Sequence, residues 1–107
     1  MSDARTLYRA AFQHLVDDRL DEAVEGFRRA VEADPQLPLA WNGLSQAYRR
    51  RGEWDRAIEA AERLAALEPD DPLSHTNLSI LYQSVGRIAD AEAAKARAAQ
   101  LQAQGGR

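Results

Sequence analysis

Hydrophobic residues along this chain recur at the three- and four-residue spacing of amphipathic α-helices. In the first segment, one helical face consists of Leu7, Ala10, Ala11 and His14, and Leu15 follows. The same spacing continues through five further segments, and none shows the sustained alternation typical of a β-strand. Only a few residues separate the segments, so each helix should run antiparallel to its neighbour. The pattern predicts an all-α protein of six antiparallel helices.

Prolines and glycines mark the predicted ends of these helices. Pro35 and Pro69 close the second and fourth segments, because proline disfavours the helical conformation in the residue before it. Gly52 and Gly86 follow the third and fifth segments, where they can supply the left-handed residue that often ends a helix. The last segment is expected to fray from Gln102 onward.

The pattern also repeats at a fixed interval. Ala23, Ala57 and Ala91 are separated from one another by steps of 34 positions. A helix–turn–helix unit of about 34 residues is the period of a helical repeat array. The same interval relates Pro35 to Pro69, Leu44 to Leu78, Ser45 to Ser79, Tyr48 to Tyr82, Gly52 to Gly86 and Leu67 to Leu101.

These residues resemble the tetratricopeptide repeat (TPR) family, whose unit carries Trp, Leu, Gly and Tyr, a Gly turn, Ala, an aromatic, Ala and a closing Pro. The second unit has Ser45 in place of the usual Gly and Ala61 in place of the aromatic. The first unit keeps Phe27 but has Asp18 at the turn, and the third has His75 in the Trp place. The second unit retains most of the signature: Trp41, Leu44, Tyr48, Gly52, Ala57 and Pro69.

The resemblance covers about residues 4–104 and implies an α-solenoid, a right-handed superhelix of three helix–turn–helix units. It implies a single domain, 1–107, with repeats at about 4–37, 38–71 and 72–105. Because the family binds partner proteins in a concave groove, we expect a non-catalytic interaction module, an adaptor for a peptide or helix of another protein.

Small residues are expected where the paired helices approach most closely. We place Ala57 at that crossing, because a small side chain lets two backbones meet. Val24 and Ile58 are expected to face the first helix of the next unit. The corresponding residue of the third unit is Glu92, and Lys95 corresponds in the same way to Ala61. Since terminal repeats need a polar outer face, we expect the last helix to cap the array and the array to be complete in this chain.

The resemblance also implies which residues would face a ligand. The strip is apolar at its first end and rich in amides further on, and amides can bond a peptide backbone of any sequence. One subclass of the family grips the C-terminal carboxylate of chaperones through Lys, Asn and Arg, but Tyr8, Phe12, Gly43, Leu73 and Asn77 stand in those places. That clamp is therefore not expected. The expected groove residues are Tyr8, Phe12, Leu15, Asn42, Gln46, Arg49, Thr76, Asn77, Ile80 and Gln83.

Two features have more than one interpretation. The basic run Arg49–Arg51 ends a predicted helix, where cations are favourable, but it could also contact an anion at the mouth of the groove. Tyr8 and Phe12 either pack within the protein or remain on its surface. A self-associating structural module, a possible homodimer, is the alternative to an adaptor. Its candidate surface combines Tyr8 and Phe12 with the alanines of the last segment: Ala89, Ala93, Ala96 and Ala103.

Composition excludes several other classes. The chain has no Cys, and its two His residues, His14 and His75, are expected to be packing residues rather than ligands, so no metal site, cofactor or catalytic group is predicted. A net charge of −3 argues against a nucleic-acid partner. No apolar run is long enough to span a membrane, and no export signal is seen, so we expect a cytoplasmic protein without membrane or nucleic-acid contacts.

Overall fold

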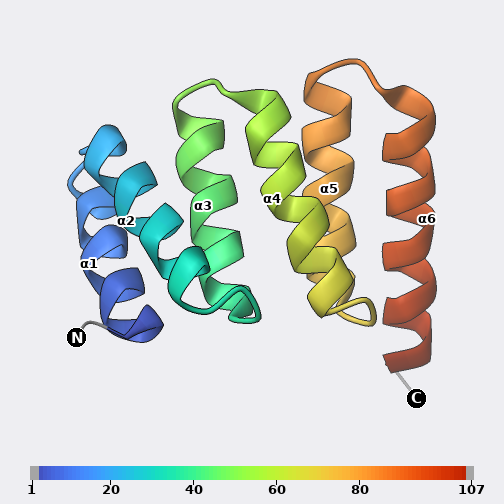
Figure 1. The fold of residues 1–107 in the computed structure, drawn as a ribbon. Helices are drawn as coiled ribbons and strands as arrows, with labels where there is room; N and C mark the ends of the chain where they lie inside the picture. Colours follow the sequence, from blue (N-terminus) through green and yellow to red (C-terminus); the bar gives the residue numbers. More distant parts are fainter. Residues whose placement is uncertain (1–2, 106–107) are drawn as a thin grey trace.

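The computed structural model describes residues 3–105, which form six helices and no strand. The helices stand side by side in chain order, with the two ends of the chain at opposite ends of the array (Figure 1). The predicted all-α solenoid of three helical hairpins is thereby confirmed. The helices are α1 (Ala4–Val16), α2 (Leu20–Ala33), α3 (Pro38–Arg50), α4 (Trp54–Leu67), α5 (Pro72–Ser84) and α6 (Ile88–Gly105).

Aspartates cap the starts of two helices, and the end of the last helix departs from expectation. Asp3 caps α1 by accepting a hydrogen bond of 2.8 Å from the backbone N–H of Thr6, which lowers the pKa of its carboxyl group. Asp71 caps α5 through the N–H of Leu73 at 3.0 Å. The predicted fraying from Gln102 is wrong for the described part of the tail, because α6 continues to Gly105, and residues 106–107 lie outside the described residues. Leu101 is buried and anchors this last part of the helix.

The turns within the three hairpins share one backbone conformation. Gly52 and Gly86 have φ angles of 78° and 80°, in the left-handed region that glycine adopts without steric cost. Asp18 holds the equivalent place in the first hairpin with a φ of 61°. The aspartate therefore carries a steric cost that the two glycines avoid.

Within each hairpin, the two helices cross at small residues. Ala57 is fully buried, and its carbonyl accepts a hydrogen bond of 2.9 Å from the Ser45 hydroxyl. Ser79 makes the same bond to the carbonyl of Ala91 at 2.8 Å. Ser45 and Ser79 occupy the position where the family usually has Gly, so each hydroxyl adds a bond between the helices at the crossing.

A second bond repeats at the start of each later hairpin. The indole Nε1 of Trp41 donates to the carbonyl of Pro35 at 2.7 Å. His75 replaces this tryptophan in the third unit, and its Nε2 lies 2.8 Å from the carbonyl of Pro69. Because a carbonyl can only accept, Nε2 must carry the proton. The expectation that His75 is a packing residue agrees with this role.

The spacing between hairpins is uneven along the array. α1 and α3 pack against each other, whereas α3 and α5 have no pair of Cα atoms within 8 Å. At the first junction Phe27 is fully buried, and a Cβ atom at Gly43 would overlap its ring. Glycine at this position therefore lets α3 approach α1 and α2 closely, and α5 lacks an equivalent glycine.

The outer face of α6 is polar, as the sequence suggests for the end of an array. Glu92 and Lys95 are exposed, whereas Val24 and Ile58, in the places that correspond to Glu92, are buried. Within residues 3–105, no helix combines the length and apolar character required to cross a bilayer.

Ala57 provides a test of the hairpin crossing. Replacing it with Leu should lower the free energy of unfolding by about 1–3 kcal/mol, because the added side chain overfills a site without free volume. Urea unfolding measures the change. The control is Ala66→Leu on the exposed face of the same helix, which should change stability by no more than about 0.5 kcal/mol. Equal midpoints for the two variants would contradict the assigned crossing.

Tyr82 provides a pH-dependent test of the contact between the second and third hairpins. Its hydroxyl donates to Glu62 at 2.6 Å, and burial, followed by this bond, raises its pKa to about 12. The unfolded chain loses this proton near pH 10, so stability should fall as pH rises from about 10 to 12. In Tyr82→Phe this component should be absent, and stability at pH 7 should be lower by about 0.5–1.5 kcal/mol. Urea unfolding of both proteins between pH 7 and 12 measures the difference, and parallel profiles would contradict it.

Candidate binding groove

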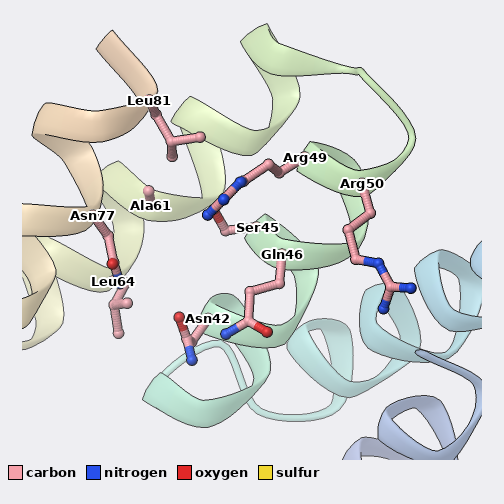
Figure 2. Close-up of a pocket in the computed structure, with 9 residues that line it drawn as sticks. All are labelled: Asn42, Ser45, Gln46, Arg49, Arg50, Ala61, Leu64, Asn77 and Leu81. Atoms are coloured by element: carbon pink, nitrogen blue, oxygen red, sulfur yellow. The ribbon is translucent and has the colours of Figure 1, made fainter. Parts of the chain in front are cut away.

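A cavity of about 270 Å³ opens between α3, α4 and α5 (Figure 2). Its floor is apolar and consists of Ala61 and Leu64 from α4 and Leu81 from α5, all of them buried. We call it the central cavity. The complete lining is Asn42, Ser45, Gln46, Arg49, Arg50, Ala61, Leu64, Asn77 and Leu81.

The central cavity continues into a second cavity of about 290 Å³. The two share Asn42, Leu64 and Asn77, so together they form one trough, which we call the groove. Its second part also contains the side chains of Arg5, Leu37, Pro38, Leu39, Glu68, Asp71, Leu73 and Ser74. The groove thus draws on the first helix of every hairpin, α1, α3 and α5.

The position of the central cavity follows from two substitutions in the repeat. Ala61 stands where Phe27 fills the junction between the first two hairpins. Asn77 likewise stands where Gly43 accepts the phenylalanine ring. The second junction therefore lacks both the aromatic side chain and the close helix approach, and space remains between α3 and α5.

The structure brings four of the predicted groove residues together. Asn42, Gln46 and Arg49 extend from successive turns of α3, and Asn77 approaches from α5 (Figure 2). Amide groups that donate and accept thus surround an apolar floor. That combination suits a chain with both a backbone to hydrogen-bond and an apolar side chain to bury.

The other predicted groove residues lie elsewhere or are occupied within the protein. Tyr8 is half-buried, with its ring centroid 6.0 Å from that of Phe12 and 5.8 Å from that of Phe27. Leu15 is only 4% exposed, so its predicted role in the groove is wrong: the side chain belongs to the core. The Thr76 hydroxyl bonds back to the carbonyl of Pro72. The remaining three predicted groove residues are exposed but line neither cavity: Phe12, Ile80 and Gln83.

Sequence reasoning missed two exposed leucines of the groove. Leu39 and Leu73 line the second cavity, with 44% and 64% of their surface exposed. They are 34 positions apart, each next to a proline that begins a helix. The repeat interval, which places a leucine directly after the first proline of both helices, was the available signal. Both leucines add apolar surface to the groove.

The three consecutive arginines divide into two structural residues and one that faces the cavity. Arg50 donates to the carbonyl of Leu15 at 2.8 Å and to Asp18 at 2.7 Å, and thereby joins the first two hairpins. Arg51 lies 2.9 Å from a Glu53 oxygen, at ion-pair distance though not in hydrogen-bond geometry. Arg49 has no carboxylate within ion-pair distance among residues 3–105 and extends over the central cavity (Figure 2).

The central cavity is locally cationic in an acidic protein. Its lining contains no Asp or Glu and includes Arg49, which has no carboxylate of the described residues within ion-pair distance, whereas the chain as a whole has a net charge of −3. Arg50 also lines the cavity, but its guanidinium is paired with Asp18. A larger depression of about 650 Å³ lies on another face of α3 and α4, but it is lined by charges of both signs, including Arg56, Glu59 and Arg63. Carboxylates and guanidinium groups line that depression together, whereas the lining of the central cavity has no carboxylate, so the central cavity is the stronger site for an anion.

The described residues contain no arrangement suited to metal binding. No group of three or more His, Cys, Asp or Glu side chains within residues 3–105 could hold a metal ion. His14 lines a shallow depression between α1 and α2, and His75 is bonded to Pro69 at the start of α5. The two imidazoles therefore do not share a site.

Comparison with known proteins agrees with this architecture. A family model described as tetratricopeptide repeat matches residues 14–78, and the chain belongs to the tetratricopeptide repeat family. No curated protein matches the sequence significantly. The family assignment therefore rests on the repeat unit.

Several solved structures share the fold at low sequence identity. A crystal structure of MamA superposes with a TM-score of 0.93 at 21% identity, covering 97% of this chain and 61% of that chain. The first TPR of Spaghetti (RPAP3), bound to the HSP90 peptide SRMEEVD, gives 0.86 at 18%, covering 92% and 79%. The secretion translocator chaperone SycD of Yersinia enterocolitica gives 0.85 at 23%, covering 94% and 76%. The chain spans about three-fifths of the length of MamA.

Asp18 and Arg50 provide a test of how the array supports its first turn. Asp18→Ala and Asp18→Gly both remove the ion pair with Arg50, but only alanine retains the steric cost of a positive φ. The glycine variant should therefore be more stable than the alanine variant by about 1–2 kcal/mol in urea unfolding.

The matched control reverses this order. Glu59 is exposed in the interior of α4, so Glu59→Ala should be more stable than Glu59→Gly by about 1 kcal/mol. If alanine and glycine were equivalent at position 18, the left-handed turn would be absent in solution.

Proposed function

We propose that this protein is a non-catalytic interaction module whose groove binds a peptide or helical segment of a partner protein. The observation that carries the proposal is the composition of the groove. Exposed Leu39 and Leu73 lie in one continuous trough with the amides of Asn42 and Asn77. Apolar surface can hold side chains of a ligand, while amides can bond its backbone.

The structural neighbours support binding of another protein without identifying it. Spaghetti's first TPR is bound to an HSP90 peptide, and SycD is a secretion translocator chaperone. The carboxylate-clamp mode of the family is not part of our proposal. Tyr8 and Phe12 pack into an aromatic cluster where that clamp has Lys and Asn, and Gly43 is covered by Phe27.

The alternative is self-association through the outer face of α6. Ala89, Ala93, Ala96 and Ala103 are exposed there and would allow a close approach of helices. Glu92 and Lys95 lie between them and are also exposed, so an interface would have to bury or pair both charges. Light scattering distinguishes the two: a single-chain mass at high concentration is expected, and a dimer lost on Ala96→Glu would favour self-association. The predicted cytoplasmic location stays a prediction.

Groove variants test the proposal directly. Arg49 of α3 and Leu73 of α5 are exposed side chains that line the groove, so Arg49→Gln/Leu73→Ser should leave the fold intact. This double variant should reduce capture of the partner from native lysate at least about tenfold, measured by quantitative mass spectrometry and then by calorimetry with the identified protein. Tyr8 is left unchanged because its ring packs on Phe27.

The matched control removes the same chemistry outside the groove. Arg28 on α2 and Ile88 on α6 are exposed and line neither cavity. Arg28→Gln/Ile88→Ser should capture the partner as well as the unmodified protein, with equal thermal midpoints for all three proteins. Equal capture by the groove variant and this control would contradict the proposal.

A further inference from the structure

The first junction between hairpins has three aromatic side chains, and the second junction has none of them. Tyr8, Phe12 and Phe27 form a cluster with centroid distances of 6.0 Å and 5.8 Å. One repeat later, Asn42, Gln46 and Ala61 occupy the three equivalent positions. The first junction is thus filled by the protein's own rings, whereas amides and an alanine surround the central cavity at the second.

The central cavity is large enough for an aromatic ring. An apolar cavity of about 150 Å³ is enough to bind benzene, and the central cavity measures about 270 Å³. Its floor consists of Ala61, Leu64 and Leu81, which are 1%, 8% and 2% exposed. An aromatic ring placed there would contact aliphatic side chains, as Phe27 does within the core at the first junction.

The rim of the central cavity adds polarity and charge. Asn42, Gln46 and Asn77 place amide groups around the opening, where they can bond the backbone on either side of an inserted side chain (Figure 2). Arg49 extends over the same opening, and no carboxylate of the lining compensates its charge. A ligand with a carboxylate beside the ring would supply that missing charge.

We propose that the central cavity binds an aromatic side chain of a partner segment that carries an acidic residue directly beside it. The partner's ring takes the place that Phe27 has at the first junction, the three amides bond the adjacent backbone, and Arg49 pairs with the acidic side chain. This inference rests on the proposed function and specifies the recognition element for the same groove. On this proposal, an aromatic ring fills the second junction only when the partner is bound.

Short peptides test the inference without knowledge of the partner. The side-chain NH₂ groups of Asn42, Gln46 and Asn77 give separate signals in ¹H–¹⁵N NMR spectra. Acetyl-Gly-Phe-Asp-Gly-amide should shift all three in a saturable manner, with a dissociation constant in the millimolar range or below. Replacing Phe by Ala should abolish the shifts, and replacing Asp by Asn should weaken binding about 2- to 5-fold. Absence of saturable shifts, or equal binding of the Ala peptide, would overturn the inference.

The variant Ala61→Phe/Asn77→Gly copies the first junction into the second. It fills the central cavity with the protein's own ring and gives α5 the glycine that α3 has at Gly43. The double variant should fold, as judged by circular dichroism and thermal unfolding, and should bind the Phe-Asp peptide at least about tenfold more weakly. Undiminished binding by a folded double variant would show that the ring does not enter the central cavity.

Arg49 gives an independent test that does not depend on repacking. In Arg49→Gln, the Phe-Asp and Phe-Asn peptides should bind with equal affinity, whereas Arg28→Gln should retain the difference seen in the unmodified protein. Persistence of that difference in Arg49→Gln would overturn the assigned role of Arg49.

The experiments distinguish failure of the proposed groove from failure of the proposed aromatic pocket within it. If the partner were captured by Ala61→Phe/Asn77→Gly but not by Arg49→Gln/Leu73→Ser, the groove would be correct and the aromatic pocket wrong. If all of these variants captured it equally, the groove itself would be wrong. Loss of capture in both, together with the peptide shifts, supports the aromatic pocket.

Discussion

The close crossing of paired helices at small residues is the contact on which the rest of this structure depends. Ala57 and Ala91 are buried where their helices meet α3 and α5, and a serine hydroxyl bonds each of their carbonyls. In the first hairpin, a Cβ at Gly26 would lie 2.7 Å from the Cβ of Ala11, so the same closeness requires glycine there. Because each hairpin has this fixed shape, the hairpins can stack in register. The larger side chains between hairpins then determine whether a junction is closed or open.

Those larger side chains explain why one junction is closed and the next is open. Phe27 fills the first junction, and α3 approaches α1 over Gly43. With Ala61 and Asn77 in the equivalent places, α5 is separated from α3 and the central cavity lies between them. The groove is therefore a local consequence of two substitutions in an otherwise regular repeat. This is why similarity to other repeat proteins at 14–23% identity defines the fold but not the ligand.

Most of the fold could be predicted from the sequence because it depends on period and spacing. The repeat interval placed Ala57 at the crossing, and the turn at Gly52 has the expected left-handed conformation. The binding surface was harder to predict from the sequence, because it depends on which side of each helix is covered by its neighbours. Leu15 was expected in the groove but is buried, and Leu73, considered only for the missing clamp, lines it. The separate roles of Arg49 and Arg50 required the position of Asp18, which no local pattern contains.

The left-handed turn at Asp18 has a consequence for how the array comes apart. Gly52 and Gly86 adopt their turns at no steric cost, whereas the cost at Asp18 is offset by an arginine that belongs to the neighbouring hairpin. In a nearest-neighbour description of repeat proteins, part of the first unit's stability therefore resides in its interface and not in the unit itself. Unfolding of the middle unit would therefore also remove the arginine that offsets the strained turn of the N-terminal unit.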